Sequence, residues 1–151
     1  MRHNTVTIRP FQPADQAAIK QLILDGLADH WGMLDPALNP DLDDIANSYR
    51  GETFLVAVQA GAIVGCGALV EEEGMVGYGR IVRMSVKKEN RRQGVGQLIL
   101  RHLQLAAKQR RFRKMVLETT QTWSEVIAFY QAHGYHIIGH HNGDTHFEKA
   151  I

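Results

Sequence analysis

Disulfide bonds and membrane-spanning segments are both missing from this sequence of 151 residues. Cys66 is the single cysteine, so no intrachain disulfide can form. Every apolar run is shorter than the roughly 18 residues that a spanning helix needs, and no charged-then-apolar leader opens the chain. These absences argue against a secreted disulfide scaffold and against a membrane protein. The default expectation is a cytoplasmic location.

What is present fits one ordinary globular domain. Hydrophobic residues make up 44% of the chain and charged residues 22%, which is the usual balance for a folded protein. A chain of this length buries about 68 to 70% of the surface that its unfolded form exposes, so it needs no disulfide or metal to hold a core. We therefore expect residues 1–151 to form a single domain.

Positive charge is scarce in the first half of the chain and concentrated in the middle. Residues 1–79 carry 4 basic and 11 acidic side chains, whereas residues 80–114 carry 12 basic side chains and one acidic one, Glu89. This asymmetry predicts that a polyanion binds the middle third of the chain. A solvated helix face rich in arginine would give the same count, so both interpretations stay open.

Hydrophobic periodicity predicts strands and helices that alternate along the chain. The expected order is a strand from residue 6 that stops at the prolines 10 and 13, a helix at 15–28, a turn-rich stretch at 32–40, a short acidic helix at 41–49, strands at 54–58, 63–71 and 81–86, a long helix at 94–107, a strand at 115–120, a helix at 125–133, and strands at 135–139 and 145–150. This order favours an α/β sheet of mixed strand direction.

A glycine-bearing loop joins the strand at 81–86 to the long helix, with the sequence Arg91-Arg92-Gln93-Gly94-Val95-Gly96. Unpaired N–H groups and the helix dipole attract anions at such a helix start, and glycines let a pyrophosphate approach the backbone. A Walker loop is excluded because no Gly-Lys-Ser/Thr ending is present. A dinucleotide fingerprint is disfavoured because Ile99 stands where a third glycine or alanine would be needed.

These residues resemble the GNAT superfamily of acetyl-coenzyme A (acetyl-CoA) dependent N-acetyltransferases. The signature of that family, Arg/Gln-x-x-Gly-x-Gly/Ala after a strand, matches residues 91–96 in full. Further blocks have the spacing of the family: Met84-Ser85-Val86, Val116-Leu117-Glu118, Phe129-Tyr130 with Gly134-Tyr135, and the opening Ile8-Arg9-Pro10-Phe11.

The resemblance implies a mixed α/β (α+β) fold: a mixed, mostly antiparallel sheet of about seven strands with a splayed parallel pair, flanked by about four helices. Acetyl-CoA, the implied co-substrate, would lie between the strands at 81–86 and 115–120, and no metal is expected. Its thioester arm would bond the backbone of Met84 and Val86, on either side of Ser85. Its pyrophosphate would bind the loop of Arg91, Arg92, Gln93, Gly94, Val95 and Gly96.

Acetyl transfer to an amine needs a base, because an alkyl ammonium has a pKa of about 10.4. Glu118 is the candidate base, since its position twelve residues before Tyr130 is similar to that of the base in ribosomal-protein acetyltransferases of this superfamily. The alternative is a strand carboxylate paired with Lys114 or another cation. Tyr130 matches the family tyrosine that protonates the departing thiolate, unless it is only an aromatic residue packed beside Phe129. A backbone N–H near Met84 would polarise the thioester carbonyl.

Two further residues test the resemblance. Trp123 stands where many relatives carry asparagine, so a pantetheine contact must differ there or pass to Ser124. Cys66 has no flanking histidine to activate it as an acyl carrier, which favours a small core residue.

Four histidines crowd the last predicted hairpin together with Asp144, but their spacing matches no standard metal site. His146 and Glu148 are candidates for contact with the acceptor. An acidic rim in the first helices would attract cationic amines, or would only keep the surface soluble: Asp25, Asp29, Asp35, Asp41, Asp43 and Asp44. Arg80 and Arg83 would instead bind a carboxylate, as in an amino-acid acceptor.

The leading hypothesis is an enzyme that transfers an acetyl group from acetyl-CoA to a primary amine of a small molecule or amino acid, by direct attack in a ternary complex. The alternatives are a protein or peptide N-acetyltransferase and a non-catalytic acyl-CoA sensor. The expected partners are acetyl-CoA, an amine acceptor and, by family resemblance, a second copy of the chain. A nucleic acid is not expected, because no aromatic residues interleave the basic stretch. A membrane is not expected, because no apolar run is long enough to span one.

Overall fold

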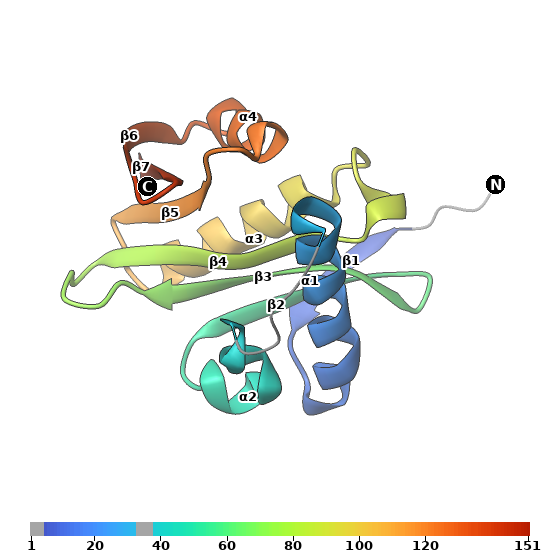
Figure 1. Ribbon diagram of the computed structural model, residues 1–151. Helices are drawn as coiled ribbons and strands as arrows, with labels where there is room; N and C mark the ends of the chain where they lie inside the picture. The colour runs from blue at the N-terminus through green and yellow to red at the C-terminus, as the bar shows by residue number, and fades with distance from the viewer. Residues whose placement is uncertain (1–4, 33–37) are drawn as a thin grey trace.

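The computed structural model describes residues 5–32 and 38–151, which form a seven-stranded sheet with helices on both faces (Figure 1). The strand order is β1-β2-β3-β4-β5-β7-β6, and the pairing is antiparallel except between β4 and β5. The α-helices and strands are β1 (Val6–Pro10), α1 (Gln16–Trp31), α2 (Ile45–Ser48), β2 (Thr53–Gln59), β3 (Ala62–Glu71), β4 (Tyr78–Val86), α3 (Val95–Gln109), β5 (Lys114–Thr120), α4 (Ser124–Ala132), β6 (His136–His141) and β7 (Asp144–Ala150). The expected fold class is confirmed.

One predicted element is wrong in its details. The acidic helix expected at 41–49 is divided into a 3-10 turn, Pro40–Asp43, and the single turn of α2. Asp44 separates the two because its backbone is not helical (φ −149°, ψ 83°) and its carboxylate accepts a hydrogen bond from the N–H of Asn47. A capping aspartate starts a new helix at this point. Of the turn-rich stretch expected at 32–40, residues 33–37 lie outside the described residues.

Each face of the sheet carries its own apolar cluster. The long helix α3 covers one face, and its buried side chains recur at helical spacing: Val95, Ile99, Leu100, Leu103 and Ala107. Four of these belong to the stripe that the sequence predicted; Leu100 does not, and the predicted Leu98, His102 and Ala106 are only partly buried. The helix lies close to β3, since a Cβ placed on Gly67 would be 2.8 Å from Ile99 Cγ2. On the opposite face α1 and α2 bury a second cluster that includes Ile19, Ile23, Leu42 and Ile45.

The parallel pair β4 and β5 is joined over only part of its length. The ladder contains Tyr78 opposite Lys114, Gly79 opposite Met115 and Arg80 opposite Val116, and then stops. Beyond Arg80, β4 continues beside β3 and β5 continues beside β7, so the two strands diverge. Figure 1 shows β5, β6 and β7 as a group set apart from β2, β3 and β4. The splayed parallel pair expected from the family resemblance is therefore present.

A β-bulge lies in β4 at the level of this divergence. Cys66 of β3 pairs with Ser85 while Ala68 pairs with Val82, so β4 carries one extra residue between the two pairs. Arg83 occupies the bulge with φ 56°, a left-handed conformation that is uncommon for arginine. Bulges bend a strand and redirect its side chains, which here separates β4 from β5.

No helix in residues 5–32 and 38–151 combines the length and the apolar character needed to span a membrane.

Candidate active site

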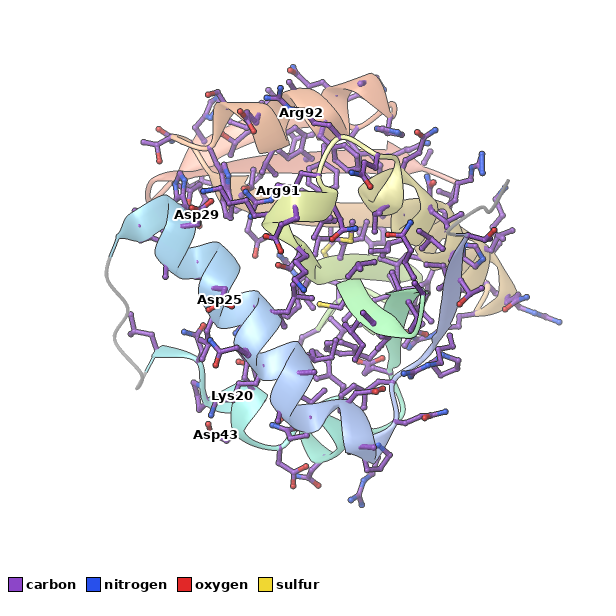
Figure 2. All side chains as sticks on the ribbon, turned by 90° about the vertical axis from the view of Figure 1, so that its right-hand side faces the viewer. Lys20, Asp25, Asp29, Asp43, Arg91 and Arg92 are labelled. Carbon is purple, nitrogen blue, oxygen red and sulfur yellow. The ribbon has the colours of Figure 1, made fainter. Side chains whose placement is uncertain are left out.

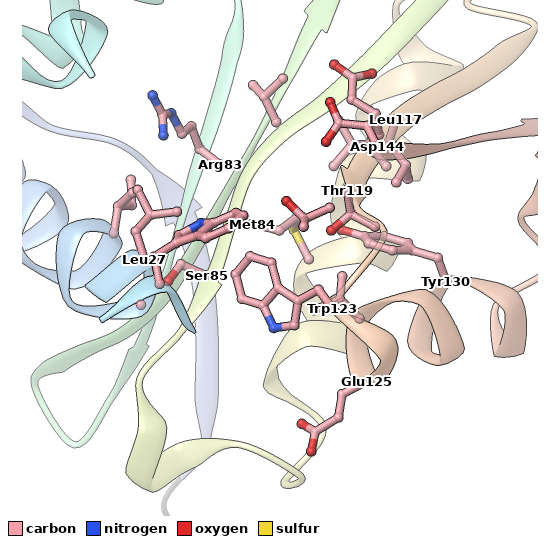
Figure 3. Close-up of a pocket in the computed structure, with 18 of the residues that line it drawn as sticks. Leu27, Arg83, Met84, Ser85, Leu117, Thr119, Trp123, Glu125, Tyr130 and Asp144 are labelled. Carbon is pink, nitrogen blue, oxygen red and sulfur yellow. The ribbon is translucent and has the colours of Figure 1, made fainter. Parts of the chain in front are cut away.

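A cleft of about 400 Å³ opens between the diverging ends of β4 and β5 (Figure 3). Its walls come from β4, from β5 with the start of β7, from α4 and from the second half of α1. Six of the site residues predicted from the sequence line it: Met84, Ser85, Arg91, Glu118, Trp123 and Tyr130. The remaining predicted residues lie in the loop and helix ends next to these.

The predicted pyrophosphate loop, residues 91–96, leads directly into the first turn of α3. Gly94 has φ 84°, and a Cβ at this position would meet no atom within 4 Å, so the loop backbone is open to an approaching group. Gln93 donates a side-chain hydrogen bond to the carbonyl of Glu89 (3.3 Å), and Val95 is buried in the core. The loop is thus anchored on both sides, with the N–H groups that begin α3 available to an anion.

The end of β4 presents one edge of its backbone to the cleft, because β3 pairs with the other edge and β5 no longer pairs with this one. Met84 turns its sulfur toward Gly67 of β3, on the side that α3 covers, whereas Ser85 faces Gly26 of α1. The carbonyl of Val86 accepts a hydrogen bond from Arg91 Nε (3.2 Å). The first residue of the loop therefore fixes the end of the strand to which the thioester arm is expected to bind.

The last turn of α1 contacts both sides of the cleft. Asp29 accepts hydrogen bonds from Arg91 (3.1 Å) and Lys88 (3.3 Å), and Figure 2 shows Asp29 at this end of α1 next to Arg91. The hydrogen bonds from Arg91 and Lys88 lower the pKa of Asp29 below its ordinary value. Across the cleft, His30 stacks on Trp123 with ring centroids 4.3 Å apart and planes inclined by 13°. The indole therefore packs on α1.

Ser124 and Arg92 are predicted site residues next to Trp123 and Arg91 in the sequence, and they lie outside the cleft wall. Ser124, the sequence-based substitute for a pantetheine contact, begins α4 and is exposed, but it is not part of the cleft wall. Arg92 is strongly exposed and pairs with Glu125 at 3.4 Å. Gly96 lies against Phe129, whose ring would be 3.5 Å from a Cβ at that position.

Tyr130 reaches the cleft from α4 and is 4% exposed (Figure 3). Its ring packs against Tyr135 and Phe147, with centroid separations of 5.6 and 5.9 Å. Burial raises the pKa of the Tyr130 hydroxyl above its ordinary value, and the nearby Tyr135 adds to this effect. The hydroxyl consequently keeps its proton at neutral pH, and the higher pKa makes it a weaker acid than an exposed tyrosine.

Glu118 lines the cleft from β5 and is bound by a guanidinium. Arg80 of β4 donates hydrogen bonds to Glu118 and to Glu72, so one cation lies between two carboxylates and the group of three keeps a net charge of −1. Lys114, the cation considered for Glu118 from the sequence, pairs instead with Glu148 at 2.6 Å. Glu118 is thus a paired carboxylate that still belongs to a negatively charged group.

The basic segment at 80–114 is largely neutralised inside the fold. Eight of its basic side chains form ion pairs with carboxylates of the chain: Arg80, Arg83, Lys87, Lys88, Arg91, Arg92, Arg110 and Lys114. Net charge counted along the sequence therefore overstated the positive surface. The folded chain brings the acidic first half of the sequence onto the basic middle third.

The acidic rim expected in the first helices is used in the same way. Asp29 and Asp41 bind Arg91 and Arg83, Asp43 binds Lys20, Asp44 caps α2, and Asp25 accepts from Gln21. Asp35 lies outside the described residues. Arg80 and Arg83, considered for binding a substrate carboxylate, already hold carboxylates of the chain itself.

Cys66 is fully buried beneath the bulge of β4. Its Sγ donates a hydrogen bond to the carbonyl of Arg83 (3.3 Å), and burial raises the pKa of the thiol to about 12. A thiol with such a pKa carries almost no thiolate at neutral pH and is a poor nucleophile. The residue has the character of a core side chain, as its sequence context indicated.

The histidines of the last hairpin lie on the paired strands β6 and β7. The rings of His141 and His146 are 4.6 Å apart, and His140 Nδ1 lies 3.0 Å from Thr145 Oγ1. Within residues 5–32 and 38–151, no group of three or more histidine, cysteine or acidic side chains has an arrangement that would hold a metal ion. Glu148 is paired with Lys114 and lies outside the cleft wall.

Sequence reasoning missed two parts of the cleft. One is the apolar side of α1, where Ile23, Leu27 and Trp31 face β4. The helical period predicted from the sequence included Leu27 but neither Ile23 nor Trp31, and it did not show which part of the sheet the helix covers. The other is Asp144, which the sequence placed only among histidines. The sequence showed that Asp144 and His146 share one face of a strand, but it did not show that this strand pairs with β5.

Comparison with known proteins gives a consistent result. A family model described as an acetyltransferase (GNAT) domain matches residues 50–137. A curated protein named IAA acetyltransferase, from Azospirillum brasilense, is 31% identical over 132 residues, which cover 86% of this chain and 84% of the relative.

Solved structures share the fold over nearly the whole chain. A GNAT-family acetyltransferase from Staphylococcus aureus Mu50 has a TM-score of 0.87 at 18% identity, and PaiA N-acetyltransferase from Thermoplasma acidophilum, solved with coenzyme A, has a TM-score of 0.87 at 16% identity. Each match covers 97% of this chain and 99% of the other. At such low identity the likeness concerns the fold alone.

Proposed function

Because the chain belongs to the GNAT family of acetyltransferases and uses acetyl-CoA as its co-substrate, we propose that it acetylates a primary amine of a small molecule or amino acid by direct attack in a ternary complex. The observation that carries this proposal is the loss of pairing between β4 and β5 after Arg80, which opens a cleft lined by Glu118 and Tyr130. The contact of α1 with both sides of this cleft favours a small acceptor over a folded protein.

The residues of the cleft suit the binding of acetyl-CoA, which supplies an activated acetyl thioester when bound. Residues 91–96 and the first turn of α3 would hold the pyrophosphate, and Gly94 leaves the loop backbone accessible. On the edge of β4 that β5 leaves unpaired, the backbone of Met84 and Val86 would bond the thioester arm, with Ser85 on the α1 side. A backbone N–H near Met84 would donate to the thioester carbonyl oxygen as negative charge develops on it.

Glu118 is the proposed proton acceptor for the acceptor amine. An alkyl ammonium must lose a proton before its nitrogen can attack, directly to the carboxylate or through a water molecule. Arg80 orients Glu118. Glu72 binds the same guanidinium, so the three side chains together keep a net negative charge, which favours the acceptance of a proton from a cationic amine. Arg80 is a positioning residue in this scheme.

Tyr130 is the proposed proton donor to the leaving group. Glu118 takes the first proton of the ammonium and passes it to water. The amine nitrogen then bonds to the acetyl carbon, the carbon–sulfur bond breaks, and the thiolate takes the hydroxyl proton of Tyr130. The second proton of the nitrogen goes to Glu118, and Tyr130 regains a proton from water. The position of Tyr130 in the wall of the cleft supports this role, because a phenol is protonated at neutral pH and can donate to a thiolate that forms beside it. The burial of Cys66 supports direct attack over an acyl-cysteine intermediate.

Free thiol released from acetyl-CoA, measured across a panel of primary amines, tests the proposal. Tyr130→Phe is expected to lower kcat about 100-fold or more while calorimetry still detects binding of acetyl-CoA. Cys66→Ala serves as the control and should keep its turnover. Thiol release that does not depend on the amine, or a Tyr130→Phe variant with full turnover, would contradict the assignment.

We also propose that residues 1–151 form a single domain, that the protein is cytoplasmic and that it forms a homodimer. The described strands share one sheet, which supports the single domain. The free thiol of Cys66 suits a reducing compartment. The exposed Ile137 and Ile138 on the edge strand β6 offer an apolar surface for a second copy, which sedimentation would detect.

A further inference from the structure

Five charged side chains line the cleft, and four of them have a partner of opposite charge. Arg83 binds Asp41, Arg91 binds Asp29, Glu118 binds Arg80 and Glu125 binds Arg92. The fifth is Asp144, for which the described part of the chain provides no ion pair and no side-chain hydrogen bond. Among the described residues, Asp144 is therefore the charged side chain of the cleft that has no partner of opposite charge.

Asp144 lies on the same face of the sheet as Glu118. It begins β7 opposite Thr120, and His146, two residues later, is opposite Glu118. Alternate residues of a strand share a face, and diagonal neighbours across an antiparallel pair are about 7 to 8 Å apart. Figure 3 shows Asp144 beside Thr119 on the β5 wall of the cleft. Two carboxylates, one paired with Arg80 and one free, thus lie at a distance that a short molecule can span.

Apolar side chains form part of the lining of the same cleft. Ile23, Leu27 and Trp31 of α1 line it from one side, and Val82 of β4 and Leu117 of β5 line it from the other. Methylene groups would be favourably removed from water here, whereas hydroxyl groups would lose hydrogen bonds. The lining suits an aliphatic chain that joins two polar ends.

We propose that Asp144 binds a second ammonium group of the acceptor, and that aliphatic diamines are the preferred substrate class. This inference rests on the proposed acetyltransfer: one nitrogen loses its proton to Glu118 and attacks, while the other stays charged and donates a hydrogen bond to Asp144. A half-buried carboxylate with no counter-charge gains a charge-assisted hydrogen bond from such a cation. Asp144 is a specificity-determining residue here and takes no proton in the reaction.

Steady-state kinetics with a series of aliphatic diamines and with monoamines of matched chain length tests the proposal. The wild-type protein is expected to have the lower KM for diamines. Asp144→Asn should raise the KM for diamines about ten- to hundred-fold, as the loss of one charge-assisted hydrogen bond predicts, and change the KM for monoamines less than about two-fold. Because His141 lies opposite Asp144 and His146 is close, the assays belong at about pH 8.5, where imidazole is uncharged in general.

Glu73→Gln provides the matched control, since it removes the same charge from an exposed position outside the cleft. It should leave both KM values unchanged. Asp144→Glu keeps the charge but extends it into the cleft, so its preferred diamine should become shorter. This second variant decides the question if Asp144→Asn does not fold.

Equal kcat/KM for diamines and matched monoamines in the wild-type protein would overturn the inference, as would an Asp144→Asn variant whose KM rises equally for both. An unchanged length preference in Asp144→Glu would also overturn it. A different result speaks against the proposed function instead: acetyl-CoA binds by calorimetry, but no amine in any panel releases thiol.

Discussion

The two faces of the sheet are covered by helices that are held in different ways. On one face α3 packs through a continuous series of apolar side chains, among them Ile99 and Leu103, both fully buried. On the other face α1 has an apolar centre but is attached near its ends by charged groups. Figure 2 shows Lys20 with Asp43 at one place along α1 and Asp29 with Arg91 at another.

We therefore expect the α3 face to contribute mainly to the stability of the fold and the α1 face to respond to ligands. Apolar burial is lost only when the helix leaves the sheet, so α3 is expected to behave as a rigid part of the molecule. Exposed ion pairs contribute little energy and exchange partners easily, so the end of α1 can yield to an anionic or cationic ligand. The cleft opens on the side of α1, where the charged contacts of Asp29 lie beside it.

The largest effect is expected for Leu103→Ala on the α3 face. Leu103 is fully buried, and removing its side chain should lower the free energy of unfolding by about 2 to 5 kcal/mol through lost burial and the cavity left behind. Denaturant unfolding measures this change. Leu105→Ala on the same helix is the control, because Leu105 is 55% exposed and its loss should matter little. Equal effects of the two variants would remove the contrast between the faces.

A smaller loss is expected at the start of α1. Asp15 accepts two hydrogen bonds from Arg9 (2.7 and 2.9 Å) and one from the N–H of Gln12 (2.8 Å). Asp15→Asn should lower the free energy of unfolding by about 1 to 3 kcal/mol at neutral pH, because the contact with the guanidinium of Arg9 loses the negative charge of the carboxylate.

The pH dependence of this contact has a defined sign. The hydrogen bond from Arg9 lowers the pKa of Asp15 in the folded protein, so the stabilisation is complete above the ordinary aspartate value of about 3.9 and is lost as the pH falls through the lower folded value. The difference between the wild-type protein and Asp15→Asn should therefore narrow below about pH 4. A constant difference from neutral to acid pH would contradict the assigned cause.

The smallest effect is expected at the other end of α1. Asp29 occupies the cations of Arg91 and Lys88, with which a pyrophosphate would compete. Asp29→Asn should tighten the binding of coenzyme A about two- to five-fold at low salt, and less at high salt, with no change in stability. Calorimetry gives the affinity. Asp43→Asn, which breaks the pair with Lys20 away from the cleft, should leave it unchanged. Weaker binding in Asp29→Asn would mean that Asp29 holds Arg91 in its binding position.

Much of the fold was predictable because its signals are local. The apolar period of α3, the Asn142-Gly143 turn before β7 and the glycine loop after β4 each depend on neighbouring residues. Asn142 and Gly143 have the positive φ values that a tight hairpin turn requires, 54° and 81°. The acidic helix failed as a prediction because one capping residue, Asp44, competes with continuation of the helix.

The candidate site was predictable only in part. Met84, Arg91, Glu118 and Tyr130 were found from motif spacing and do line the cleft. The partner of Glu118 was not found, because Arg80 lies 38 residues away in the chain and meets it only through the parallel pairing of β4 with β5. The free carboxylate of Asp144 was missed for the same reason, since it reaches the cleft through the pairing of β7 with β5.

The amino-acid sequence by itself determined which segments form strands and helices and where an anion-binding loop precedes a helix, because periodicity, capping and turn chemistry act over a few residues. Only the tertiary structure decided which charges remain free. The basic middle third and the acidic first third neutralise each other once α1 lies across the sheet, and that outcome depends on distances between segments far apart in the chain. What is left in the cleft after this pairing is the single uncompensated carboxylate among its described charged groups, Asp144.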